Sequence, residues 1–209
     1  MVVLAFVALC FWSWPRRPPG PEPLFLDTSR YGFESLPVPW VRQAYGTGKG
    51  TVAVARSADV ARLGRYSLKL AMDLARAERN KSEGEAYVDM RSFPPVGVKA
   101  PIDLEGVPVT AWIYVPRGAA GHRRRPNGVQ LFVKDENWKG QYGTWLNLRG
   151  RTERWFQICL TPSARTPNLG YTDMGFDPTK IMVIGVKVGA GTASTAKYRG
   201  PIYMDAVNW

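Results

Sequence analysis

The side chains best suited to binding a ligand are amides, a lysine and aromatic rings that recur at every second position between residues 127 and 160. Successive side chains of a β-strand point to opposite faces, so residues two apart share a face. One face of each predicted strand is aliphatic, as in Val129, Leu131 and Val133. Rings stack on flat apolar partners and amides hydrogen-bond in both directions, so the other face is a candidate ligand surface. Its members are Gln130, Phe132, Lys134, Trp145, Asn147, Trp155 and Gln157.

Some of these rings are also candidates for a core between two sheets. Trp112 and Phe132 flank runs of β-branched residues, so we expect both in the core. Trp145 and Trp155 have polar neighbours, and the pattern leaves them open between core and surface. The polar members are more informative, because burying an amide or a lysine without partners costs several kcal/mol. We therefore expect solvent or a ligand at Gln130, Lys134, Asn147 and Gln157.

Trp138 and Tyr142 belong to a different setting, in or beside the polar loop of residues 135–141. Loops run over the surface and often carry binding residues. We expect both rings to be exposed.

Histidine and cysteine chemistry has little support in this chain. The single histidine, His122, lies in an Arg-rich loop, which removes zinc sites built on several histidines. Of the two cysteines, Cys10 lies in an apolar N-terminal run and Cys159 on a predicted strand. We expect no disulfide framework, and we expect Cys159 to be a small buried apolar residue.

Carboxylate pairs are the remaining route to catalysis. A glycosidase needs two carboxylates that flank the scissile bond at one of two characteristic separations. Glu85 and Asp89 share a strand face, and Asp135 and Glu136 lie at a loop edge. Neither pair belongs to a recognisable catalytic motif. The mark of an enzyme would be a carboxylate pair that faces a cleft, with one raised pKa.

Short strands joined by turns make up most of the chain, which has 209 residues with 21 Gly and 17 Pro. We find no long helix and no repeat, and the standard solutions are then a sandwich or a barrel. The ordered part begins and ends on a strand, as in a jelly roll that brings its first and last strands together. We predict an all-β fold for residues 24–209, a single β-sandwich of jelly-roll topology with about ten antiparallel strands. The expected strands are 24–29, 52–55, 64–74, 85–90, 107–116, 129–134, 144–148, 155–160, 181–188 and 202–209.

The first 14 residues are apolar except for Ser13, and a Pro-rich segment follows. The apolar run is too short for a comfortable membrane span and resembles the hydrophobic core of an export signal. A non-cleaved membrane anchor is the alternative. We predict that residues 1–23 are an export signal or anchor plus a Pro-rich linker, and that the folded part is secreted or extracytoplasmic.

The net charge of +11 permits an acidic partner. The basic residues are dispersed, however, and the densest run is only His122 to Arg125. No nucleic-acid-binding motif is visible, so we expect no nucleic-acid partner. An ordinary basic surface on a monomer explains the charge.

Four segments carry a resemblance to a known family. They are Leu24–Asp27, the G-x-x-S-L-K-L strand Gly64–Leu70, the stretch Gln130–Trp145, and the closing segment Gly200–Trp209 with its Y-x-D-x-V-x-W pattern. Together they resemble jelly-roll carbohydrate-binding modules of the galactose-binding-like superfamily, which are often attached to bacterial glycoside hydrolases. No catalytic domain accompanies the module in this chain.

The resemblance implies a glycan ligand and a structural Ca²⁺. Many relatives hold calcium where the first and last strands meet, which corresponds here to Asp27 and Asp205, with Glu34 as a further candidate. A sugar ring offers an apolar face for stacking and a rim of hydroxyls for polar side chains. The implied ligand-binding residues are Tyr114, Gln130, Lys134, Trp138, Tyr142, Trp145, Asn147, Trp155 and Gln157. Apart from Trp138 and Tyr142, which belong to the loop region, we expect them on one face.

The sequence thus predicts an exported module that binds an oligosaccharide or polysaccharide, a β-linked glycan, without cleaving it. A glycoside hydrolase or lyase of jelly-roll fold is one alternative. A structural envelope or adhesion domain is the other, and it would present a flat apolar patch in place of an aromatic and amide-lined face.

Overall fold

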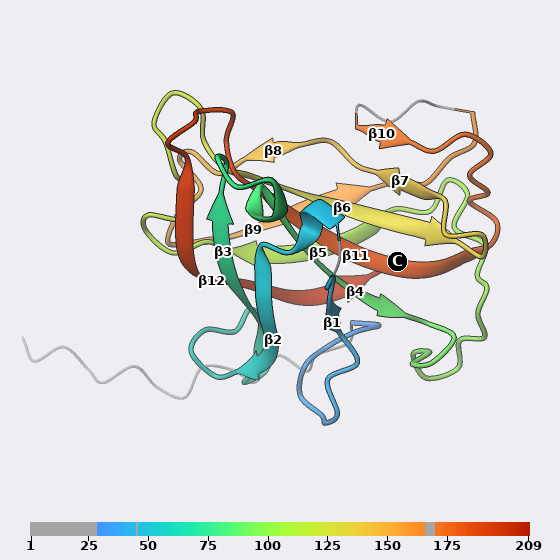
Figure 1. Ribbon diagram of the computed structural model, residues 1–209. Helices are drawn as coiled ribbons and strands as arrows, with labels where there is room; N and C mark the ends of the chain where they lie inside the picture. Colours follow the sequence, from blue (N-terminus) through green and yellow to red (C-terminus); the bar gives the residue numbers. More distant parts are fainter. Residues whose placement is uncertain (1–28, 45, 166–169) are drawn as a thin grey trace, which may run out of the picture.

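The computed structural model describes residues 29–44, 46–165 and 170–209, and their strands form two antiparallel sheets (Figure 1). The described part has twelve strands and two short 3-10 turns. Their bounds are β1 (Val41–Arg42), η1 (Gly46–Gly48), β2 (Thr51–Ser57), β3 (Ser67–Ala75), η2 (Arg79–Lys81), β4 (Glu83–Asp89), β5 (Val109–Tyr114), β6 (Gly128–Asp135), β7 (Gly140–Tyr142), β8 (Leu146–Asn147), β9 (Trp155–Leu160), β10 (Tyr171–Thr172), β11 (Ile181–Gly189) and β12 (Lys197–Asn208). The all-β sandwich prediction is confirmed, with more and shorter strands than expected. The predicted first strand lies outside the described residues except for Ser29.

The two sheets are built from strands that alternate between them along the chain. The seven-stranded sheet has the order β1-β4-β11-β6-β7-β10, with β8 paired to β6. The five-stranded sheet has the order β2-β3-β12-β5-β9. Within the described residues the chain therefore crosses from one sheet to the other after β1, β3, β4, β5, β8, β9 and β11.

The core lies between the inner faces of the sheets. On β6 the buried aliphatic side chains are Val129, Leu131 and Val133, as the alternation predicted. On β3 every second residue from Leu68 to Leu74 is buried in the same cluster. Because both sheets turn their aliphatic residues inward, the polar and aromatic positions of each strand face outward on two opposite sides of the molecule.

Three expectations about individual residues were wrong. Phe132 is fully buried, but it packs with Met182 and Val183 in a separate cluster outside the inter-sheet core. Trp112 is half-buried on the outer side of β5, beneath the Arg62 guanidinium, because Ala111 and Ile113 take the inward positions. Cys159 is exposed, since it shares the outer side of β9 with Gln157 while Ile158 and Leu160 face the core.

The last strand contains a β-bulge that shifts its alternation. The register of β12 against β5 changes between Asp205 and Asn208, and Ala206 has a positive φ of 50°. Ile202 and Met204 belong to the core cluster, and the bulge then brings Val207 into it in place of Ala206. The sequence pattern had placed Val207 on the same face as Asp205.

The two ends of the described chain lie side by side, as a jelly roll requires. Tyr31 and Val207 form an antiparallel bridge, in which the Tyr31 N–H donates to the Val207 carbonyl at 3.0 Å and the Val207 N–H donates to the Tyr31 carbonyl at 3.1 Å. The predicted first strand, residues 24–29, lies outside the described residues except for Ser29, so its pairing with the last strand stays a prediction. Within the described ranges, no helix has the length and apolar character needed to cross a membrane.

Candidate ligand-binding face

The outer face of the seven-stranded sheet, here called the Phe132 face, carries a row of aromatic residues across its strands. Tyr87 of β4, Gly185 of β11, Phe132 of β6, Tyr142 of β7 and Tyr171 of β10 are paired in register, one to the next. The Phe132 and Tyr142 rings lie 5.2 Å apart at 31°, and the Tyr142 and Tyr171 rings 6.2 Å apart at 49°. Exposure rises along this row from the fully buried Phe132 to Tyr171, which is 61% exposed.

Glycines on neighbouring strands let the large rings lie down on this sheet. A Cβ on Gly185 would come within 2.2 Å of the Phe132 ring. A Cβ on Gly128 would come within 2.2 Å of the Trp145 indole, and one on Gly189 within 2.5 Å. Any other residue at these positions would push the rings away from the sheet. The Trp145 ring thus lies against two paired glycines, and 39% of the residue's surface is exposed.

A second exposed tryptophan stands on a rigid turn at the far end of β6. Trp138 has a φ of 62°, which is strained for a residue with a large side chain. The buried Asp135 carboxylate holds this turn by accepting the backbone N–H groups of Asn137, Lys139 and Asp177 at 2.8, 3.0 and 2.9 Å. The Trp138 ring meets Tyr87 edge-on, with centroids 6.1 Å apart, and is 40% exposed. The strained backbone therefore fixes an aromatic side chain on the face.

Charged and amide groups fill the positions between the rings. The Lys187 ammonium lies 2.8 Å from a Glu83 oxygen, 3.5 Å from a Glu85 oxygen and 5.1 Å from the Tyr142 ring centre. Gln130 pairs with Lys187 in register and is buried, so the expectation that its amide meets solvent was wrong. On the other side of the Phe132 ring, the Lys134 ammonium lies 5.6 Å from its centre. The face therefore combines rings with hydrogen-bonding groups of both kinds.

Burial changes the acid–base properties of two groups on this face. Burial raises the pKa of the Glu85 carboxyl above its ordinary value of 4.5, and it outweighs the opposing charges of Lys187 and Lys134. No described group donates a hydrogen bond to the buried Glu85 Oε2. Burial and the nearby carboxylates of Glu85 and Asp173 also raise the pKa of the Tyr142 hydroxyl, which stays protonated at neutral pH.

The structure divides the nine predicted ligand-binding residues between the two sheets. Six belong to the seven-stranded sheet or its loops: Gln130, Lys134, Trp138, Tyr142, Trp145 and Asn147. Tyr114, Trp155 and Gln157 lie on β5 and β9 of the five-stranded sheet, so the expectation of one shared face was wrong. Period-2 alternation shows which side of a strand faces outward, and it does not show which sheet the strand joins. Of the two rings expected to be exposed, Trp138 is exposed and Tyr142 is half-buried.

The outer face of the five-stranded sheet, here called the Tyr114 face, has its own ring cluster. Tyr114 is paired in register with Tyr203 and Trp155, and their rings lie 6.1 and 5.6 Å from its ring. The Tyr203 hydroxyl donates to the Asp59 carboxylate at 2.9 Å. Asp59 in turn accepts a hydrogen bond from Lys69 at 2.8 Å. These rings pack on one another and on charged groups of the same chain.

Sequence reasoning missed several members of the Phe132 face. Glu83, Tyr87, Lys187 and Tyr171 lie on strands far from the central stretch in sequence, and only strand pairing brings them to it. Gly185 was predicted within an apolar strand without a role. A glycine inside such a strand is a known sign of close approach by another group, and here that group is a ring.

The predicted calcium ligands are only partly within the described residues, because Asp27 lies outside them. The buried Asp205 Oδ2 accepts the backbone N–H groups of Arg62 and Leu63 at 2.7 and 3.1 Å, and Oδ1 accepts that of Ala206 at 2.8 Å. Glu34 accepts the N–H groups of Arg65 and Tyr66 at 2.9 Å each. Backbone N–H groups hold the Asp205 oxygens in the described structure, and calcium binding there stays a prediction of the family resemblance.

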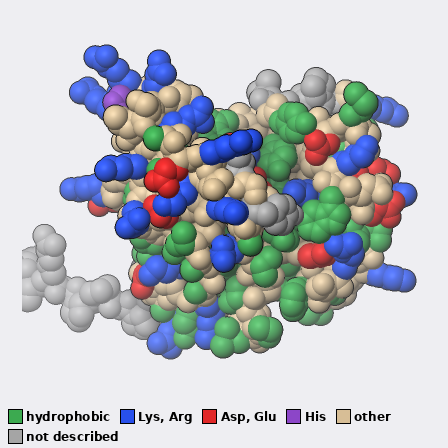
Figure 2. Space-filling view, in the orientation of Figure 1, with side chains coloured by type: hydrophobic (Ala, Val, Ile, Leu, Met, Phe, Trp, Pro, Cys, Tyr) green, Lys and Arg blue, Asp and Glu red, His purple; other side chains and the backbone are tan. Residues whose placement is uncertain are grey.

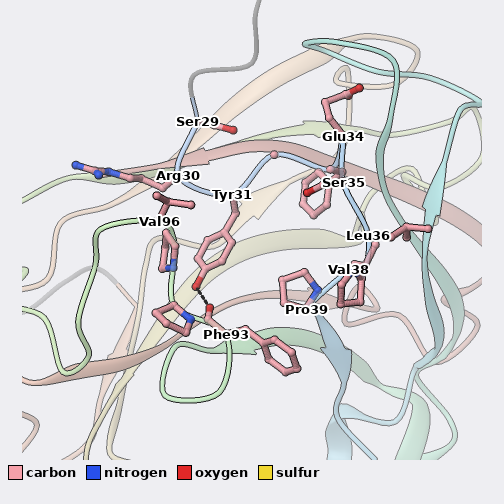
Figure 3. Close-up of a pocket in the computed structure, with 15 residues that line it drawn as sticks. Ser29, Arg30, Tyr31, Glu34, Ser35, Leu36, Val38, Pro39, Phe93 and Val96 are labelled. Carbon is pink, nitrogen blue, oxygen red and sulfur yellow. Dashed lines mark hydrogen bonds between the residues drawn. The ribbon is translucent and has the colours of Figure 1, made fainter.

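A separate cavity of about 440 Å³ lies where residues 29–39 approach residues 93–96 (Figure 3). Figure 3 shows the Tyr31 ring reaching between the two segments, where its hydroxyl donates to the Phe93 carbonyl at 2.7 Å. Much of the lining is proline and aliphatic. We interpret the cavity as a gap between two loops and not as a site for chemistry.

The fold is shared with solved carbohydrate-binding modules. One structure, from a study of promiscuous specificity among carbohydrate-binding modules of the β-sandwich superfamily, has a TM-score of 0.55 at 23% sequence identity. The match covers 88% of this chain and 62% of that chain, so this chain spans less than two thirds of its length. A second structure is CBM27-1 of Caldicellulosiruptor saccharolyticus in complex with mannohexaose, with a TM-score of 0.51 at 18% identity, covering 81% and 88% of the two chains. No protein-family model and no curated protein sequence matches this chain significantly.

Proposed function

We propose that this protein binds a β-linked polysaccharide along the Phe132 face without cleaving it. The observation that carries the proposal is the exposed Trp145 ring, held flat over Gly128 and Gly189. A ring fixed in this way loses little freedom when a sugar stacks on it, which is the main advantage of a preformed site. The fold shared with carbohydrate-binding modules supports the proposal.

The two exposed tryptophans define the size of the ligand. Trp145 lies over Gly128 at the start of β6, and Trp138 meets Tyr87, which is in the same row as Phe132. At about 3.3 Å per strand residue, the four residues from Gly128 to Phe132 separate these two rows by about 13 Å along the strands. That span suits an extended oligosaccharide and exceeds a single sugar ring.

Polar groups between the tryptophans are placed to bind the sugar hydroxyls. The Lys134 and Lys187 ammonium groups donate hydrogen bonds to these hydroxyls. Several contacts of this kind with stacking give affinities on the order of micromolar to millimolar.

Affinity electrophoresis of the full chain tests the proposal. The gels would contain soluble β-glucan, mannan, xylan or pectin. We expect at least one polymer to retard the protein and the Trp145→Ala variant to lose that retardation. The Trp155→Ala variant on the Tyr114 face serves as the matched control and should stay retarded. No retardation of the wild-type protein by any polymer would reject the proposal.

Glu85 favours a second candidate function, a glycoside hydrolase or lyase. Its raised pKa is one property of a general acid, and Glu83 lies on the same face. Lys187 contacts both carboxylates, however, and its ammonium offsets one of their two charges. Release of reducing ends from a retarding polymer, abolished by Glu85→Gln, would establish the enzyme in place of the binding module.

The proposed ligand also implies a location. Structural polysaccharides lie outside the cytoplasm, so we propose that residues 1–23 direct the folded part to the cell exterior or hold it there. Cell fractionation of a tagged full-length chain tests this, and recovery in the cytoplasmic fraction alone would contradict it.

A further inference from the structure

A pocket of about 430 Å³ lies at the Trp145 end of the Phe132 face. Its floor is the last row of the sheet, in which Gly189 pairs with both Glu83 and Gly128, and Gly128 with Asn147. Trp145 forms one wall, so the ring proposed to stack on a sugar also lines this pocket. The pocket therefore continues the proposed binding face and receives the next part of a bound chain.

Two loops form the opposite wall, one before β6 and one between β11 and β12, and they meet at the upper left of Figure 1. The buried Asn127 side chain joins them, since its amide donates to the Ala119 carbonyl at 3.0 Å and its oxygen accepts the Gly191 N–H at 2.9 Å. A Cβ on Gly191 would come within 1.8 Å of the Arg125 carbonyl. The two loops are thus packed backbone to backbone, and the wall is formed before any ligand arrives.

Three arginines from two segments line this pocket. Arg124 and Arg125 come from the loop before β6, and Arg76 follows β3, where its N–H bonds to the Ala196 carbonyl. Among the described residues none of the three makes an ion pair, whereas the one acidic lining residue, Glu83, is paired with Lys187. The lining therefore carries three positive charges, whereas its one negative charge, on Glu83, is already paired with Lys187. Figure 2 shows this corner as a group of blue side chains around the purple His122.

We propose that this pocket binds the carboxylate of a uronic acid residue in a polysaccharide that lies along the Phe132 face. This inference rests on the proposed function and specifies its substrate class as an acidic glycan. Guanidinium groups stay protonated at all physiological pH values and bind carboxylates through paired N–H groups. Trp145 stacks on the ring of the same sugar, while Arg124 and Arg125 hold its carboxylate. Part of the positive charge of the protein then binds the ligand at this pocket.

A matched pair of ligands tests the inference, because a β-1,4-linked mannuronate hexasaccharide differs from mannohexaose in carrying a carboxylate at C6 in place of a hydroxymethyl group. Isothermal titration of the full chain would compare the two at low and high salt. We expect the mannuronate to bind at least about fivefold more tightly at low salt, with the preference shrinking at about 0.5 M salt as charges are screened.

Two double variants distinguish the effect of the pocket arginines from the effect of the protein's overall positive charge. Arg124→Gln with Arg125→Gln should weaken mannuronate binding about tenfold, as expected for the loss of two charge-assisted contacts, and should leave mannohexaose binding within about twofold. Arg42→Gln with Arg123→Gln removes the same charge, and neither residue lines the pocket. This control should leave both affinities within about twofold.

Each result decides between the two proposals. Equal binding of both hexasaccharides, or equal losses in the two double variants, would overturn the acidic-glycan inference and leave the proposed function intact. Dextran sulfate that binds as tightly as mannuronate, with the same loss in the pocket variant, would overturn the assignment to a carboxylate. A wild-type protein that binds neither these ligands nor any neutral glycan would reject both proposals.

Discussion

The two outer faces of this sandwich both carry aromatic rings at register-paired positions, but the rings have different partners. On the Phe132 face the large rings lie against glycines, namely Gly128, Gly185 and Gly189. On the Tyr114 face the paired positions are themselves aromatic, so Tyr203, Tyr114 and Trp155 stand beside one another. Trp145, set against two glycines, keeps 39% of its surface exposed, whereas Tyr203, set beside Tyr114, is 6% exposed.

The charged groups near the rings also differ between the two faces. On the Tyr114 face, Asp59 bonds to both Tyr203 and Lys69, and the Arg62 guanidinium lies 4.4 Å from the Trp112 ring centre. These groups come from the loop of residues 59–66 and cover the rings. On the Phe132 face the Lys134 and Lys187 ammonium groups also lie near rings, but Glu85 Oε2 has no donor among the described residues. Aromatic content alone therefore does not distinguish the two faces, whereas the partners of the side chains do.

The largest effect we predict is a loss of stability on replacing Asp205, which holds the loop of residues 59–66 beside the Tyr114 face. Asp205 is fully buried and binds three backbone N–H groups, two of them from the loop of residues 59–66. Replacing Asp205 by Ala leaves these groups unpaired, so the free energy of unfolding should fall by about 3 kcal/mol. Urea unfolding measures this. A loss below about 0.5 kcal/mol would show that the carboxylate does not hold the loop.

The same residue allows a test of calcium. Because N–H groups occupy the Asp205 oxygens, we expect the midpoint of thermal unfolding of the wild-type protein to be the same in EDTA and in excess Ca²⁺. A higher midpoint in Ca²⁺, lost in Asp205→Ala, would instead support the calcium ligand predicted from the family resemblance.

Replacing one tryptophan on each face tests the comparison directly. Trp145→Ala should weaken glycan binding by at least about 30-fold, the effect of removing a central aromatic anchor. Trp155→Ala should change it less than about twofold, because that ring packs on Tyr114. Titration with the polymer that retards the wild-type protein gives both values. Equal losses would mean that the two faces are not distinguished by the partners of their rings.

The sequence predicted the sandwich and the inward side of the strands, because a buried aliphatic face leaves a period of two in each strand. It did not predict which strands share a sheet. Trp155 and Gln157 follow Trp145 and Asn147 closely, yet β9 joins the sheet opposite to β6 and β8. The alternation of apolar and polar residues in the last strand also did not predict the bulge after Asp205. Sheet membership and bulges depend on contacts between distant segments, such as Asp205 with Arg62, which local periodicity does not contain.

Replacing the glycines that lie beneath the rings should give a smaller and more specific effect. In Gly128→Ala the new methyl group would meet the Trp145 indole, which is exposed and able to move away. We expect about a tenfold loss of binding with little change in stability, since the ring leaves its stacking position. In Gly185→Ala the methyl group meets the buried Phe132, so we expect a loss of about 1–3 kcal/mol in stability. The opposite assignment of the two losses would show that glycine does not position Trp145.

The smallest effect is a difference in pH dependence between the faces. The pKa of Glu85 is raised by burial, so the folded protein binds that proton more readily than the unfolded chain. Its contribution to stability is complete below the ordinary pKa of 4.5 and is lost as the pH rises through the raised pKa of the folded state. For Asp59, hydrogen bonds from Lys69 and Tyr203 lower the pKa to about 2. Its contribution is present above the ordinary pKa of 3.8 and is lost as the pH falls toward about 2.

Glu85→Gln should therefore remove a decline in stability on the alkaline side of 4.5, and Asp59→Asn a decline on the acid side of 3.8. Urea unfolding of both variants and the wild-type protein, from about pH 2 to about pH 8, measures the two slopes. Each variant is the control for the other, because each removes one carboxylate from one face. If the Glu85→Gln curve ran parallel to the wild-type curve above 4.5, the Glu85 carboxyl would titrate normally in the folded protein. The Phe132 face would then hold Glu85 as an ordinary solvated carboxylate, and its unpartnered oxygen would no longer distinguish that face from the Tyr114 face.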